Sequence, residues 1–261
     1  MNADSLLYKI WRIAYAPALY LLLDILIVWA VQSLLVSYGN LLPGSFLAVN
    51  LAAISSMVFL AVSILVFWNL YRKDMTILHD RWILSRPWCF ALLALIGVLA
   101  SHGLSILVSL LGIDRLAGDY SGIQDAVFAA SPVLVVIQTV ILAPLSEELL
   151  FRGLLYSRLR QYLKGFWLPA LISSAAFGIF HFNLSQGIFA FLFGLLLCAV
   201  YEKFRNLWAP IALHVGGNLI SVVLVFLGFD YPAVWTGVLV MAVTLAAAGF
   251  LYEVLVRRLH F

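Results

Sequence analysis

Eight long apolar stretches, separated by short polar segments, constrain the fold of this 261-residue chain. A helix needs about 20 mostly apolar residues to cross a bilayer. Hydrophobic residues make up 65% of the chain and charged residues 10%, whereas an ordinary soluble domain has about 25% charged residues. The mean hydropathy of +1.08 also indicates a membrane protein and not a soluble domain. We therefore predict an all-α, polytopic membrane bundle of about eight transmembrane helices.

The fifth and sixth predicted spans are shorter than the others. In chain order the spans are Ala14–Val36, Phe46–Leu70, Trp88–Leu111, Pro132–Leu155, Phe166–Phe182, Gly187–Tyr201, Leu207–Leu227 and Ala233–Val256. We expect the first span to be retained, because no small-residue cleavage site follows it.

The basic residues predict the orientation of this bundle. Of the 15 Lys and Arg residues, all but Arg115 lie before the first span, after the last span, or in or at the edge of alternate connections. By the positive-inside rule, both termini and the basic connections are cytoplasmic, and Ser37–Ser45, Gly112–Ser131 and Gly228–Pro232 face outward. The segment Tyr156–Lys164 reads as an amphipathic cytoplasmic extension at the lipid headgroups. The setting expected is a bacterial plasma (inner) membrane.

Charge and cysteine content exclude several other classes of protein. The net charge of +3 comes from basic residues spread over the connections, so we expect no nucleic acid partner. The two cysteines, Cys89 and Cys198, both lie in apolar segments and support neither a disulfide framework nor a thiolate metal site.

A short charged motif, S-E-E-L-L-F-R-G from Ser146 to Gly153, interrupts the fourth apolar stretch. A charged side chain at membrane depth costs about 2.5–3.5 kcal/mol even on the lenient insertion scales. Glu148 and Arg152 are four residues apart, so a helix would place them on one face as an ion pair. Glu147 lies about 100° around the helix from Glu148 and is the candidate general base. The alternative for Glu148 and Arg152 is a purely structural buried ion pair.

Two further polar pairs occur in the apolar segments downstream. Phe177 and His181 are four apart in F-G-I-F-H, and His214 and Asn218 are four apart in H-V-G-G-N. Each pair is expected on one helix face. Gly216 and Gly217 between the latter pair would allow another helix or a substrate to approach closely.

Together, the motifs E-E-x-x-x-R, F-x-x-x-H and H-x-x-x-N resemble those of the CAAX-processing and bacteriocin-processing (CPBP, or Abi) family of intramembrane proteases. That family includes the type II prenyl-protein endopeptidases. The segment A-F-L-F-G at Ala190–Gly194 is similar to a less specific motif of the family. The resemblance covers about 100 residues, from Val127 to Val225. It implies a division into N-terminal helices (1–126), a catalytic core (127–225) and a C-terminal helix (226–261).

The resemblance implies an endopeptidase that acts within the membrane on membrane-associated or lipidated peptides. Glu147 would act as general base, and His181 would help to hold a water. His214 and Asn218 would polarise the scissile carbonyl, and Glu148 with Arg152 would be an orienting pair. Such roles suit amide hydrolysis, which needs an activated water and oxyanion donors.

Zinc is an open question in the sequence. Glu147, His181 and His214 are the candidate ligands if a metal is bound, since imidazole and carboxylate groups both bind zinc. No H-E-x-x-H motif occurs, so we favour a glutamate-dependent enzyme without a metal over a metalloprotease.

Other polar residues carry weaker hypotheses. Asp24, near the middle of the first span, is a functional candidate by its position. His102 is expected to be a satisfied bundle histidine, and His79 and His260 to be solvated. Two other functions stay open: a non-catalytic scaffold or bacteriocin self-immunity protein, and a small-solute transporter, which would predict internal repeats that the chain lacks.

Overall fold

The computed structural model describes residues 5–38, 42, 44–78, 86–113, 129–229 and 233–258, with backbone only for 75–78. Within these ranges the chain is helical and has no strand, which confirms the predicted all-α class. Among the described residues, seven helices are long and apolar enough to cross a membrane. The predicted fifth span is wrong in length, because its helix, Trp167–Ile179, has only 13 residues. His79, His260 and most of the Gly112–Ser131 connection lie outside the described residues.

The helices fall into two compact units. One unit comprises Met1–His79 and Ser121–Gly165, and the other comprises Asp80–Tyr120 and Phe166–Phe261. Helices of the first unit are α1 (Leu6–Tyr38), α2 (Phe46–Val49), α3 (Leu51–Leu78), α7 (Pro132–Val135), η1 (Val136–Leu142), α8 (Ala143–Glu148), η2 (Leu149–Tyr156) and α9 (Ser157–Tyr162). Those of the second unit are α4 (Pro87–Leu110), α10 (Trp167–Ile179), α11 (Leu184–Phe204), α12 (Trp208–Phe226) and α13 (Val234–Arg258).

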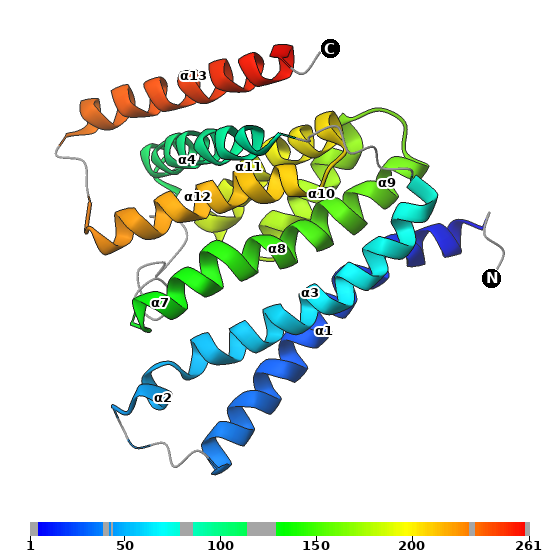
Figure 1. Cartoon of the computed structure of the whole chain (residues 1–261), viewed down its shortest axis with the longest axis vertical. Helices are drawn as coiled ribbons and strands as arrows, with labels where there is room; N and C mark the ends of the chain where they lie inside the picture. The colour runs from blue at the N-terminus through cyan, green and yellow to red at the C-terminus, as the bar shows by residue number, and fades with distance from the viewer. Residues whose placement is uncertain are drawn as a thin grey trace. The chain divides into compact units, whose positions relative to one another are not determined.

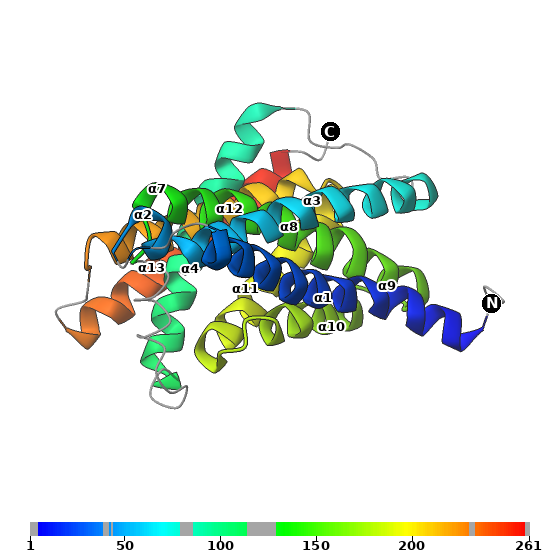
Figure 2. The same ribbon diagram turned by 90° about the horizontal axis from the view of Figure 1, so that it is seen from below.

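In the first unit, α1 and α3 run side by side, and both contact the helical run that carries the two glutamates (Figures 1 and 2). That run is continuous from Pro132 to Tyr162, so it extends seven residues past the predicted end at Leu155. Gly153 of the run lies against α3, where an added Cβ would be 3.0 Å from the ring of Tyr71. The absence of a side chain at this position therefore lets an aromatic residue of α3 pack directly on the charged motif.

Two π-helical segments, η1 and η2, widen the glutamate-bearing helix on either side of α8. At the first, the amide of Ala143 donates to the carbonyl of Gln138, five residues back. Pro144 follows, and a proline inside a helix removes one amide donor and crowds the carbonyl four residues before it. Widening of the preceding turn accommodates that ring, and such π-helical turns are frequent at functional sites.

In the second unit, α4 and α12 pack with their backbones in close approach. A Cβ added at Gly97 would lie 1.9 Å from the carbonyl oxygen of Leu213. A Cβ at Gly216 would lie 1.9 Å from the carbonyl oxygen of Ala94. Small residues permit this kind of contact between membrane helices, where van der Waals packing drives association. The crossing fixes the part of α12 that carries His214.

The glycine contact yields a stability prediction. Gly216→Ala should lower the free energy of unfolding by about 3 kcal/mol, because α4 and α12 must separate to admit the methyl group. Gly249→Ala on α13 is the matched control, since its Cβ would meet nothing within 4 Å. Thermal unfolding in detergent measures both variants. Equal melting temperatures for the two would show that the close approach does not hold the helices together.

Candidate active site

The structure confirms the ion pair within the charged motif. Glu148 and Arg152 are both fully buried, and Nη1 of Arg152 donates to Oε1 of Glu148 at 2.8 Å. Two opposite charges in an apolar interior stabilise each other, whereas either one alone would carry a large desolvation cost. The pair therefore neutralises the charge of Glu148 within the helix.

Glu147 differs from Glu148 in its surroundings. Its side chain is partly exposed, while its neighbours Ser146 and Glu148 are fully buried. Ser146 forms a hydrogen bond with the Ser63 hydroxyl of α3. Glu147 is thus the accessible carboxylate of the motif, next to a serine whose hydroxyl is hydrogen-bonded to α3.

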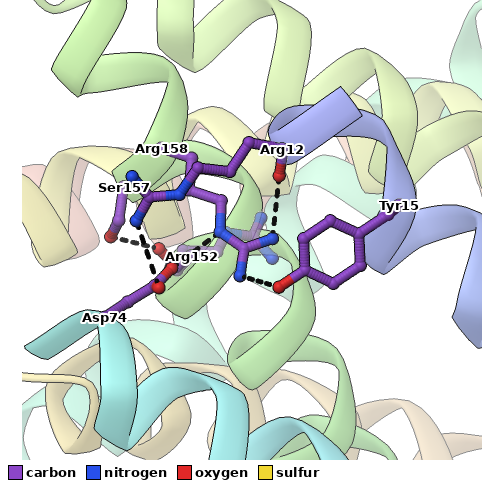
Figure 3. Close-up of polar contacts among 6 residues, drawn as sticks. All are labelled: Arg12, Tyr15, Asp74, Arg152, Ser157 and Arg158. Carbon is purple, nitrogen blue, oxygen red and sulfur yellow. Dashed lines mark hydrogen bonds and ion pairs between the residues drawn. The ribbon is translucent and has the colours of Figure 1, made fainter. Parts of the chain in front are cut away.

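A second buried charge network lies on α9, just after the motif (Figure 3). Arg158 is 1% exposed, and its Nε donates to Oδ2 of Asp74 at 2.7 Å. Its Nη1 donates to the carbonyl of Arg12 at 2.9 Å, and its Nη2 donates to the hydroxyl of Tyr15 at 2.6 Å. Arg12 reaches the other carboxylate oxygen of Asp74 at 3.2 Å. The network joins α1, α3 and α9.

This network corrects one prediction from the sequence. Tyr156–Lys164 was expected as an amphipathic segment at the lipid headgroups, yet Ser157, Arg158 and Leu159 are buried. The Ser157 hydroxyl donates to the carbonyl of Arg152 at 2.8 Å (Figure 3). Arg158 is buried because Asp74, 84 residues earlier in the chain, supplies its counter-charge, a pairing that helical periodicity does not reveal.

His181 lies in a turn and not on a helix face. Helix α10 ends at Ile179, and Phe182 follows His181 with φ of 51°. Nδ1 of His181 is 2.8 Å from the carbonyl oxygen of Phe177. Since a carbonyl can only accept, Nδ1 carries a proton, and in the neutral form of the ring Nε2 then has the lone pair. The two residues therefore do not share a helix face as predicted. His181 lies in the turn after α10, where the hydrogen bond to the Phe177 carbonyl holds its ring.

Phe177 lies between the two histidines of the predicted site. Its ring makes edge contacts with His181 and His214, with centroid distances of 4.9 and 5.7 Å. His214 is 3% exposed and also contacts the ring of Phe193, at 5.8 Å. The two histidines, from separate segments, are thus held in one aromatic cluster.

Asn218 lies one helical turn after His214 on α12 and is partly exposed. Gly217 beside it is covered by Phe193, whose ring would be 2.7 Å from an added Cβ. The Ser101 hydroxyl of α4 donates to the carbonyl of Gly217 at 3.1 Å. Phe193 and Ser101 therefore fix the backbone of α12 next to Asn218.

The predicted site residues are divided between the two units. Glu147, Glu148 and Arg152 belong to the first unit, and His181, His214 and Asn218 belong to the second. Over the described part of the chain, no group of three or more His, Cys, Asp or Glu side chains could hold a metal ion. Of the candidate zinc ligands, Glu147 belongs to the first unit, and His181 and His214 belong to the second.

Two residues of this region carry no motif signal in the sequence. Ser63 hydrogen-bonds with Ser146, and Asp74 pairs with Arg158, so both reach the glutamate-bearing run from segments far apart in the chain. Asp24, the functional candidate of the first span, is partly buried on α1.

Comparison with known proteins supports the resemblance read from the motifs. Residues 129–220 match the family described as Rce1-like, type II CAAX prenyl endopeptidase. The chain is also 28% identical over 113 residues to "Putative membrane peptidase YdiL" of Bacillus subtilis (strain 168). That similarity covers 43% of this chain and 45% of the relative, so it spans less than half of either protein. No solved structure matches this chain significantly.

The Arg12–Asp74–Arg158 network yields a second stability prediction. Asp74→Asn should lower the free energy of unfolding by about 3 kcal/mol, because it leaves a buried guanidinium without its counter-charge. Glu253→Gln is the matched control, since it removes a carboxylate from the exposed Glu253–Arg257 pair and should change stability by less than about 1 kcal/mol. Thermal unfolding compares the two variants. If the melting temperature falls no more for Asp74→Asn than for Glu253→Gln, the network does not stabilise the fold.

Proposed function

We propose that this integral membrane protein, whose residues 129–220 match the Rce1-like family, is an intramembrane endopeptidase. The observation that carries the proposal is the contrast within its glutamate pair. Glu148 is neutralised by Arg152 in the interior, while Glu147 beside it stays partly exposed. A carboxylate that is held rigidly and left accessible suits a general base.

Glu147 would take a proton from a water molecule as that water attacks the carbonyl carbon of the scissile amide. The new C–O bond forms a tetrahedral intermediate with negative charge on the former carbonyl oxygen. Glu147 would then return the proton to the leaving nitrogen as the C–N bond breaks, so protons and charge balance over the reaction. General acid–base catalysis of this kind contributes about 10²–10⁴-fold in rate.

The second unit would provide the groups that hold the water and the oxyanion. Nε2 of His181 carries a lone pair, because Nδ1 donates to Phe177, so it can accept a hydrogen bond from the attacking water. His214 and Asn218 can donate hydrogen bonds to the oxyanion without adding net charge to an apolar region. The proposal requires both units to act on one peptide bond.

The substrate class follows from the setting and from the family description. The seven membrane-length helices of the described residues point to a substrate that is itself at the membrane, and the matching family is described as type II CAAX prenyl endopeptidase. We infer a membrane-associated or lipidated peptide, cut by a protein whose termini are cytoplasmic in a bacterial plasma membrane. Residues 127–225 would form the catalytic core.

A matched pair of glutamate variants tests the proposal. The purified protein in detergent is assayed on a fluorogenic peptide that carries a prenylated cysteine. Glu147→Gln should lower kcat at least about 100-fold, because the amide side chain cannot accept the proton. Glu253→Gln, the same change at an exposed site of α13, should leave kcat unchanged.

Zinc content, measured on the same preparation, separates the two catalytic classes. Cleavage that survives chelation in protein without zinc would support a glutamate-dependent enzyme. About one zinc per chain, lost in His214→Ala, would instead make these residues ligands. Full cleavage by Glu147→Gln would overturn the catalytic role, and full activity of that variant in a cell-based immunity assay would favour the scaffold function.

A further inference from the structure

One end of the first unit carries a dense group of cations that the mechanism above does not use. At this end α1 begins, α3 and the glutamate-bearing run end, and the network drawn in Figure 3 joins the three. The described residues of these helix ends, 5–15, 70–74 and 156–165, contain seven Lys and Arg residues but one acidic residue, Asp74. This end of the unit therefore has a large excess of positive charge.

Asp74 is the counter-charge for two guanidinium groups at once. Its Oδ2 accepts from Nε of Arg158 at 2.7 Å, and its Oδ1 accepts from Nη2 of Arg12 at 3.2 Å. The two arginine side chains differ in access, because that of Arg158 is 1% exposed and that of Arg12 is 18% exposed. A single carboxylate balances only one of the two positive charges. Since a guanidinium has five N–H donors, Arg12 keeps both charge and donors for a further anion.

Lys9 adds a second accessible cation to the same face of α1. It precedes Arg12 by three residues, a spacing that places two side chains side by side on a helix. Its Nζ lies over the ring of Tyr162, 5.7 Å from the ring centroid. Tyr162 follows Arg158 by four residues, so this ring and the buried guanidinium share a face of the run. The Lys9 ammonium is thus held next to the network.

Exposed apolar side chains flank these two cations on α1. Leu7, Ile10 and Trp11 are 66%, 52% and 60% exposed. The ring of Trp11 stacks on that of Tyr15 at a centroid distance of 5.8 Å, and the Tyr15 hydroxyl accepts a hydrogen bond from Arg158. Tryptophan is enriched where a membrane meets water. Two cations among exposed apolar residues suit the level at which acyl chains end and headgroup phosphates begin.

The helix lengths agree with such a level. With 33 residues, α1 is about 50 Å long, whereas the hydrocarbon core of a bilayer is about 30 Å thick. Asp74 lies four residues before the end of α3, and Arg158 lies four residues before the end of the run. The cluster therefore belongs to the last turns of three membrane-length helices, at or near the edge of the hydrocarbon core.

We propose that Lys9 and Arg12 bind the phosphate of an anionic phospholipid, and that Asp74 and Arg158 hold Arg12 in position for it. A guanidinium can donate two parallel hydrogen bonds to a phosphate, and an ammonium adds a point charge. The same chemistry would accept a free phosphate, but the flanking apolar side chains favour a ligand with acyl chains. The site uses no residue of the proposed peptidase mechanism and stands without it.

Lipid binding to the purified protein tests this site. Phosphatidylglycerol is added to the protein in detergent, and binding is followed by native mass spectrometry and by the rise in melting temperature. Lys9→Gln leaves the Arg12–Asp74–Arg158 network in place and should weaken binding about fivefold, the effect of one cation near an anionic headgroup. Adding Arg12→Gln should bring the loss to about 25-fold. Lys9→Arg keeps the charge and should bind like the wild type.

Three controls decide the identity of the ligand. Arg258→Gln removes one charge from an exposed position of α13 and should leave binding unchanged. Phosphatidylcholine with the same acyl chains has a phosphate but no net charge, and should bind at least about tenfold more weakly. Inorganic phosphate at the same concentration should not displace the lipid.

The contrary results are equally specific. Wild-type affinity in Lys9→Gln and in the double variant would overturn the site. Equal binding of phosphatidylcholine would overturn recognition of the anionic headgroup. Displacement by inorganic phosphate would overturn the lipid as occupant and assign the cluster to a free anion.

Discussion

The buried ion pair between Glu148 and Arg152 is the interaction on which the arrangement of the charged motif depends. Each charge alone would be expensive in an apolar interior, and the two neutralise each other over 2.8 Å. The pair involves Glu148, whereas the adjacent Glu147 lies at a partly exposed position. Of the two consecutive glutamates, Glu148 thus belongs to a structural ion pair and Glu147 remains accessible.

The helix that carries this motif is held from several sides within its unit. Arg158 and Asp74 tie its end to α1 and α3, and Ser146 forms a hydrogen bond with Ser63 of α3. The widened turn before α8 follows from Pro144, and the ring of Tyr71 packs against Gly153. The second unit shows the same principle with aromatic side chains, since Phe177 and Phe193 pack against His214. In both units, side chains in or near the motifs are held by contacts from segments that are distant in the chain.

Fold class and the Glu148–Arg152 pair could be predicted from the sequence, because both depend on local periodicity. Long apolar stretches specify helices, and a spacing of four places two charges together. The position of His181 could not be predicted in the same way, since the helix before it ends at Ile179 and the residue lies in a turn. Arg158 was expected at the lipid surface, because its partner Asp74 is distant in sequence.

The proposed mechanism requires Glu147 of one unit and His214 of the other to act in the same chemical step. A double-mutant cycle on kcat measures this directly, with wild type, Glu147→Gln, His214→Ala and the double variant assayed on one prenylated peptide. Residues that act as a unit are strongly non-additive. The double variant should therefore be about as slow as the slower single variant. If the two losses instead multiply, the residues act independently, and a shared active site built from both units would be contradicted.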